Sequence, residues 1–175
     1  MPLPEVALEK KDRKPKAGKD RRRWTKVGFG KYAGKTLPQV VLIDPDWFFW
    51  AVENKVFDTP DLQAEAAEVY RKAMRIRIHQ PDSVVEYVVP GHIGKLTDVV
   101  VVPVAELRED FVEGVHEGWF DLYLPRLISP YDKTGNKIML RAIRHYVFGN
   151  EKARLTKARC EAFFDDDSNF TTSNP

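Results

Sequence analysis

The feature that most constrains this chain is a run of four consecutive aromatic residues, WFFW at positions 47–50. The run follows Asp44 and Pro45, of which the aspartate can cap the free amides of a helix and the proline suits its first turn. Trp47, Trp50 and Ala51 then share one helical face, with residues 48 and 52 on the neighbouring one. The pattern predicts a helix that is buried over most of its surface.

Elements on both sides of this helix complete a small unit over residues 24–75. Residues 24–37 alternate in character and contain three glycines, which predicts a β-hairpin that turns near Ala33 and Gly34. A second helix is expected to begin at Pro60, because apolar residues recur at helical spacing from Leu62 to Ala73. A hairpin and two helices of about 50 residues are near the lower limit for independent stability.

The glycine-rich stretch also invites comparison with a nucleotide-binding loop. Residues 30–36 read GKYAGKT, whereas a P-loop has four residues between its glycines. The stretch has only three, and Pro38 stands where the helix of a P-loop would continue. Nucleotide hydrolysis is therefore not expected.

Three motifs in this unit carry a resemblance to a known family. They are FGKYAGKTL at 29–37, PDWFFW at 45–50 and VFDTPDL at 56–62. Together they resemble the small C-terminal module of exodeoxyribonuclease X and of some DNA polymerase III epsilon-type exonucleases, which also occurs in small putative quorum-sensing-regulated virulence factors. The resemblance covers about residues 26–75 and implies a part that assists nucleic-acid binding without catalysing cleavage. The residues that match the motif are Phe29, Lys31, Tyr32, Lys35, Trp47 and Trp50.

Candidate contact residues lie on the predicted hairpin. Lys31 and Lys35 can place ammonium groups on phosphates, and Tyr32 offers a ring for base stacking. Phe29, Trp47, Phe48 and Trp50 are instead expected in the core. The hairpin therefore predicts a small nucleic-acid-binding surface.

The basic charge of the chain is concentrated at its N-terminus. Residues 1–26 contain ten of the 28 Lys and Arg but four of the 26 Asp and Glu, so they carry +6 and the remainder carries −4. Residues 1–23 are nearly free of large apolar side chains, which predicts a disordered basic arm. In it Arg21, Arg22 and Arg23 are candidates for phosphate contact, and a solubilising tail is the alternative.

Residues 76–150 predict a small α+β unit. Strands are expected at 74–79, 84–90 and 96–104. A helix is expected after them, capped by Asn136 and ended by Gly149. The fold class is therefore α+β, a β-hairpin and helix module followed by a small antiparallel sheet with packing helices. Further candidates for phosphate contact are Arg75, Arg77, Arg141 and Arg144, although Arg75 and Arg77 can equally protect an edge strand.

Residues 151–175 predict a polar and acidic tail. Asp165, Asp166, Asp167 and Phe170 are similar to the acidic, phenylalanine-bearing tips by which bacterial single-stranded-DNA-binding proteins recruit partners. Those tips end at the phenylalanine, whereas this chain continues to Pro175. An ordinary acidic tail that covers the basic surface is the alternative, so a protein partner is a hypothesis here.

Catalytic and metal sites have little support. Asp46 and Glu53 superficially match a nuclease signature, but they should stand about 10 Å apart along one helix. The four histidines are scattered, and the one cysteine allows no internal disulfide or thiolate cluster. No cofactor or metal is expected. The chain has no apolar run long enough for a membrane helix, which favours a cytoplasmic location.

The sequence thus favours a non-catalytic, nucleic-acid-binding accessory protein of bacterial or phage origin, with DNA as its partner. A protein-interaction or inhibitor module related to phage or virulence is the alternative. An unrecognised metal-dependent nuclease is a third.

Overall fold

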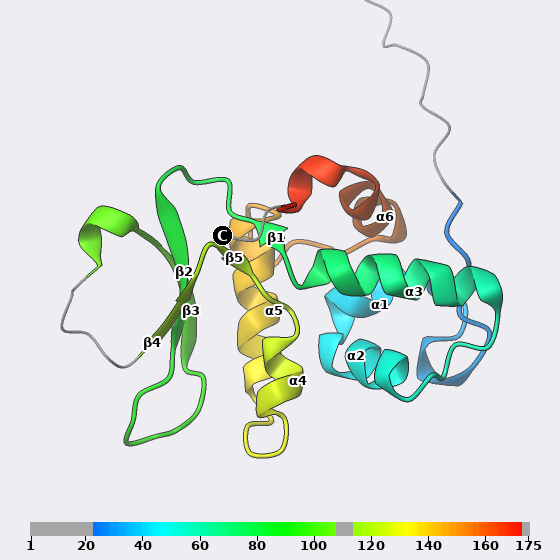
Figure 1. Ribbon diagram of the computed structural model, residues 1–175, viewed down its shortest axis with the longest axis horizontal. Helices are drawn as coiled ribbons and strands as arrows, with labels where there is room; N and C mark the ends of the chain where they lie inside the picture. The colour runs from blue at the N-terminus through cyan, green and yellow to red at the C-terminus, as the bar shows by residue number, and fades with distance from the viewer. Residues whose placement is uncertain (1–22, 108–113, 173–175) are drawn as a thin grey trace, which may run out of the picture.

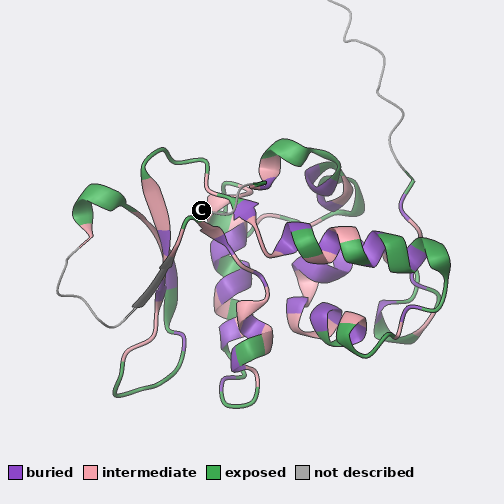
Figure 2. Ribbon diagram, in the orientation of Figure 1, coloured by how far each residue is buried: buried purple, intermediate pink, exposed green. Residues whose placement is uncertain are grey.

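The computed structural model describes residues 23–107 and 114–172 (Figure 1). The fold is α+β, as the sequence predicts, with two small antiparallel sheets. One apolar core runs through it, and Figure 2 shows its buried residues along the inner sides of the helices. In the described residues, no helix is long and apolar enough to span a bilayer.

Four helices form one side of the molecule, here called the helical half. They are α1 (Leu37–Ile43), α2 (Pro45–Glu53), α3 (Pro60–Ala73) and α6 (Lys157–Asp165). The starts of α2 and α3 are confirmed, with Asp44 accepting from the Trp47 amide at 3.1 Å and Thr59 capping α3. In Figure 1, α6 lies above α3, and α1 and α2 lie below it.

The helix α1 was not expected, and the reasoning that Pro38 prevents a helix was wrong. Pro38 lies in the first turn, where a missing amide costs nothing because it would have no helical partner. Gln39 stabilises this start by accepting a hydrogen bond from the Thr36 amide at 3.1 Å. The helix contacts α2, α3 and α6, so it lies at the centre of the helical half.

The predicted hairpin over residues 24–37 forms only in part. One antiparallel bridge joins Lys26 to Thr36, and the turn between them contains the 3-10 helix Gly30–Tyr32. Gly30 and Gly34 have φ values of 66° and 83°, which glycine adopts without the steric cost of a side chain. The glycines therefore serve to close this turn.

The other side of the molecule, here called the sheet half, is a three-stranded sheet covered on one face by a helix. Its strands are β2 (Ser83–Val88), β3 (Asp98–Pro103) and β4 (Gly114–Glu117), in the order β3-β2-β4, and its helix is α5 (Gly135–Tyr146). The short helix α4 (Leu124–Ile128) contacts both α2 and α5, and so joins the two halves. The pairing of the two predicted strands β2 and β3 is antiparallel.

The predicted strand over residues 74–79 is not part of this sheet. Only β1 (Ile76–Arg77) forms, and it pairs with β5 (Trp119–Phe120) in a separate ladder. Ile76 is fully buried there and also bridges to Phe170. The third strand of the sheet is β4, which lies in a segment without a clear period.

The start of α5 also differs from the expectation that Asn136 caps it. The Asp132 carboxylate accepts hydrogen bonds from the amides of Thr134 and Gly135, at 2.8 and 3.0 Å. Burial alone would raise the pKa of Asp132, but these bonds hold it below its usual value. Asp132 also accepts from the Leu96 amide at 2.9 Å, which ties α5 to the segment before β3.

Candidate nucleic-acid interface

A polar groove opens where the first described residues meet the start of α6. Its volume is about 390 Å³, and its lining residues are Arg23, Trp24, Thr25, Lys26 and Lys157. The three cations among them are exposed. They come from segments about 130 positions apart, so only the folded chain brings them together.

The walls of this basic groove are held by buried contacts. Thr25 donates from its amide and its hydroxyl to the carboxylate of Glu65 on α3, at 3.1 and 2.9 Å. The Trp24 side chain is 3% exposed, and its Nε1 donates to Asp165 on α6 at 2.9 Å. Thr156 caps α6 directly before Lys157. These contacts give the exposed cations a fixed base.

Lys35 lies on the same side of the helical half. Its carbonyl accepts from the Val27 amide at 2.8 Å, which places Lys35 opposite the residue that follows Lys26. The Lys35 side chain makes no hydrogen bond or ion pair within the part of the chain that the structure describes. Its charge is therefore available to a ligand.

Lys31 and Tyr32 are engaged by the helix cap. Lys31 Nζ and Tyr32 Oη donate to Asp44 Oδ2, at 2.9 and 2.7 Å. The Tyr32 ring is buried and contacts Trp47 edge-on, with ring centroids 4.8 Å apart. The expected role of Tyr32 in base stacking is therefore not supported, because its side chain is only 9% exposed and its ring contacts Trp47. Lys31 is exposed and reaches solvent beside its carboxylate.

Arg75 and Arg77 hold the end of the described chain. Arg77 Nη2 donates to the Phe170 carbonyl at 3.1 Å, and the Arg75 carbonyl accepts from the Thr171 amide at 3.0 Å. The Arg75 guanidinium lies over the Trp119 ring at 5.7 Å. Neither residue lines the basic groove.

The remaining predicted cations lie in two other parts of the chain. Arg21 and Arg22 lie outside the described residues, directly before Arg23 in the groove. Arg141 and Arg144 project from α5 in the sheet half, where Arg141 lines a different groove and the Nε of Arg144 is buried. The structure thus brings Arg23 into the groove and leaves Arg75, Arg77, Arg141 and Arg144 out of it.

The prediction of a tail from residue 151 is wrong for residues 157–170. Cys160, Phe163 and Phe164 are buried, and Phe170 is 4% exposed. Phe170 contacts the rings of Phe163 and Phe164, with both centroid distances 5.2 Å. A buried ring cannot serve as a recruiting tip, because the partner would have to unfold this packing. Asp165, Asp166 and Asp167 remain exposed at the surface.

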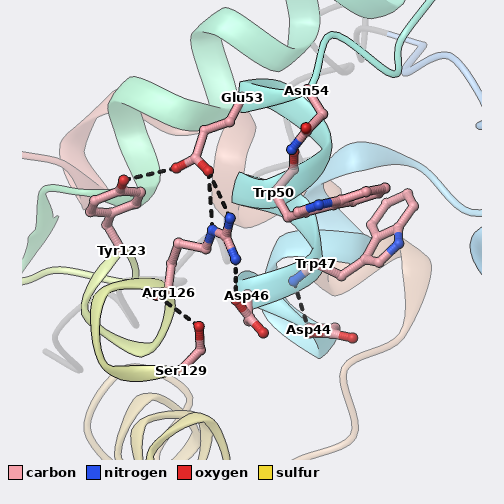
Figure 3. Close-up of polar contacts among 9 residues, drawn as sticks. All are labelled: Asp44, Asp46, Trp47, Trp50, Glu53, Asn54, Tyr123, Arg126 and Ser129. Carbon is pink, nitrogen blue, oxygen red and sulfur yellow. Dashed lines mark hydrogen bonds and ion pairs between the residues drawn. The ribbon is translucent and has the colours of Figure 1, made fainter. Parts of the chain in front are cut away.

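The acidic pair that matches a nuclease signature converges on an arginine. Arg126 lies 3.0 Å from Glu53 and 3.5 Å from Asp46, and Glu53 also accepts from Tyr123 Oη at 2.8 Å (Figure 3). Figure 3 shows Trp47 and Trp50 on the other side of α2. The ion pairs of this cluster join α2 to α4, which is a structural role.

A second polar cluster surrounds the buried Tyr87 of β2. Its hydroxyl donates to Glu117 at 3.3 Å and accepts from the Asp121 amide at 2.9 Å. Burial raises the pKa of Glu117, and raises that of Asp121 to about 6. Across residues 23–107 and 114–172, no three His, Cys, Asp or Glu side chains are grouped to hold a metal ion.

Sequence reasoning missed Lys157 and did not place Lys26 in a site. Lys26 was counted only as part of the basic segment, and Lys157 lies in a segment that was interpreted as a tail. A signal for α6 does exist, because Thr156 precedes a run with apolar residues at 160, 163 and 164. The position of Lys157 beside Lys26 has no counterpart in the local sequence.

Comparisons of the chain with models of known protein families, with curated proteins and with solved structures find no match.

Proposed function

We propose that this protein binds nucleic acid, with DNA as its principal ligand, and that it does so as a non-catalytic accessory protein. The observation that carries the proposal is the basic groove of Arg23, Lys26 and Lys157 at the point where the basic segment 1–22 joins the fold. Cations on a fixed surface contact phosphates and release counterions, which gives an affinity that falls with salt. Lys35 adds a further charge nearby. The resemblance of residues 26–75 to the exodeoxyribonuclease X module supports the same role.

The basic segment and the groove have separable roles in this proposal. Residues 1–22 contain eight Lys and Arg, which supply long-range attraction. The groove fixes where the backbone of the ligand lies, because its lysines project from anchored elements. The segment alone would bind any polyanion, whereas the groove selects the spacing of a phosphate backbone.

The test is a salt-titrated binding assay of the full chain against single-stranded DNA, duplex DNA and RNA. The variant Lys26→Ala/Lys157→Ala should weaken binding several-fold, and should reduce the slope of log K against log salt by about 2. The matched control is Lys95→Ala/Lys133→Ala, which removes the same charge from exposed positions in the sheet half. Equal losses in both double variants would show that net charge, and not the groove, sets the affinity. An absence of binding at low salt would refute the proposal.

A further inference from the structure

One edge of the three-stranded sheet is open. The order β3-β2-β4 leaves β3 paired on one side only. The Val104 amide donates to the Asp82 carbonyl at 2.8 Å. In an antiparallel pair, every second residue is hydrogen-bonded to the partner strand. In the observed register, the residues of β3 that are bonded to β2 are therefore Val102, Val100 and Asp98. The backbone groups of Val99 and Val101 therefore point away from β2.

No other described strand pairs with this side of β3. The Val99 amide is satisfied by the carboxylate of its neighbour Asp98, at 2.9 Å, which confirms that it faces outward. Pro103 has no amide to offer at the far end of the strand. Within residues 23–107 and 114–172, the groups left open are the Val101 amide and the carbonyls of Val99 and Val101, which is the pattern that an added strand pairs with.

A groove runs beside this edge, between β3 and α5. Its volume is about 340 Å³, and its walls include Val99 and Val100 from the strand and Arg141 and His145 from the helix. A space between an edge strand and a helix fits an extended chain, which can pair with the strand while alternate side chains point toward the helix.

The two sides of an added strand would meet different surroundings. Its inward side chains would face the α5 wall, where the Arg141 side chain is 53% exposed. The Arg141 guanidinium lies 3.7 Å from the Asp98 carboxylate, a long ion pair at the surface. Its outward side chains would lie beside Val100 and Val102. These valines are half-buried and lie on the sheet face opposite the buried Val99, outside the main apolar core.

We infer that the β3 edge and the α5 groove bind an extended peptide in which acidic and apolar residues alternate, the acidic ones contacting Arg141 and His145. A peptide fits better than a nucleic acid for two reasons. Open strand amides and carbonyls pair with another backbone, and not with a row of phosphates. Asp98 and Glu151 also line the groove, and their charges oppose a continuous row of phosphates more than the spaced carboxylates of a peptide, of which Arg141 and His145 can contact one each.

The test uses a fluorescein-labelled, blocked eight-residue peptide that alternates glutamate with valine, and measures its anisotropy with the full chain. Saturable binding is expected, and Val101→Pro should weaken it about tenfold by removing one open amide from the edge. Arg141→Glu should weaken binding of this peptide and strengthen binding of the matching peptide that alternates lysine with valine. Lys133→Ala is the control and should change neither.

A peptide with N-methyl groups on alternate amides tests the same backbone pairing without changing the protein. Its binding should be weaker than that of the unmethylated peptide when the methylated face is the one that pairs with β3. Equal binding of the two peptides with either methylation register, or no saturable binding, would overturn the inference. If Arg141→Glu weakens DNA binding and leaves the peptide unaffected, the groove belongs to a nucleic-acid surface instead.

Discussion

The two halves of this molecule satisfy their polar groups in different ways. In the helical half, buried charges are paired within the chain: Lys72 is 6% exposed and its amine contacts Glu68, Asp167 and the Phe164 carbonyl at 3.0, 2.8 and 2.7 Å. In the sheet half, an edge strand keeps open backbone groups, and the outer valines of the sheet are half-buried.

This difference separates the kinds of ligand that each half suits. The helical half presents exposed cations on anchored elements, which suits a charged polymer. The sheet half presents an open strand, which suits a polypeptide. The aromatic residues that dominate the sequence serve the packing of the helical half, and Trp50, at 40% exposure, is the exception among residues 47–50.

The largest loss of stability is expected when an aromatic ring is removed from the core of the helical half. Phe164 of α6 is fully buried, so Phe164→Ala should lower the free energy of unfolding by about 4 kcal/mol through lost burial and a cavity. Urea denaturation followed by circular dichroism measures this. Ala162→Ser, at an exposed position of the same helix, is the control. A loss below about 1 kcal/mol would mean that α6 does not belong to the core.

The buried amine of Lys72 tests whether paired charge stabilises the helical half. Lys72→Met should cost about 2 kcal/mol, because the Phe164 carbonyl loses its donor while the exposed Asp167 regains water. Arg71→Met, at the exposed neighbouring position, should change stability little. Thermal unfolding at neutral pH compares the two. An unchanged melting temperature for Lys72→Met would show that the burial cost of the ammonium cancels its contacts.

The buried carboxyl of Asp121 is expected to lower stability at neutral pH, whereas the buried amine of Lys72 is expected to raise it. Because burial raises its pKa to about 6, the folded chain holds a proton that the unfolded chain releases. Its contribution to the free energy of unfolding should therefore fall as pH rises from about 4 to about 6. Asp121→Asn keeps an oxygen for the Tyr123 amide and should raise stability at pH 7 by about 1–2 kcal/mol.

Urea denaturation at a series of pH values checks this prediction. The difference in stability between Asp121→Asn and the unchanged chain should shrink as the pH falls below about 6. Asp58→Asn, at an exposed position, gives the matched control. A difference that does not vary between pH 4 and pH 7 would mean that Asp121 ionises as in the unfolded chain.

The smallest expected effect compares the two faces of β3. Val99→Thr places a hydroxyl in the core and should cost about 1–2 kcal/mol, since Val99 is 2% exposed. Val102→Thr on the half-buried outer face should stay within about 0.5 kcal/mol. Chemical denaturation of the two variants measures the contrast. Equal costs would show that the outer face is covered as fully as the inner one.

The sequence predicted best those elements whose signals are local. Asp44 and Pro45 mark the start of α2, and the β-branched runs of β2 and β3 mark their pairing. The helix α1 was missed because Pro38 has opposite meanings inside a helix and in its first turn, and the position of the cap decides between them. The strand β4 was missed because its short segment folds against a distant strand. The helix α6 was missed because its segment was interpreted as a polar tail, despite the local signal of Thr156 and the apolar residues at 160, 163 and 164.

Candidate site residues could likewise be predicted where the signal is local, and not where it depends on distant parts of the chain. Arg23 could be named from the charge of its segment, and it does line the groove, but Tyr32 was misjudged because nothing local shows that Asp44 and Trp47 engage it. Lys157 could not be assigned from sequence. Its neighbours in space, Arg23 and Lys26, are more than 130 positions away.

By itself, the sequence determined the α+β class, the capped aromatic helix and the basic N-terminal segment, because composition, caps and short periods act over a few residues. Only the tertiary structure decided which charges stand free. It buried Phe170, tied Lys31 to Asp44 and brought Lys157 beside Lys26. Burial and ion pairing depend on which distant segments pack together, and the apolar core sets that packing while the charged residues take the positions it leaves at the surface.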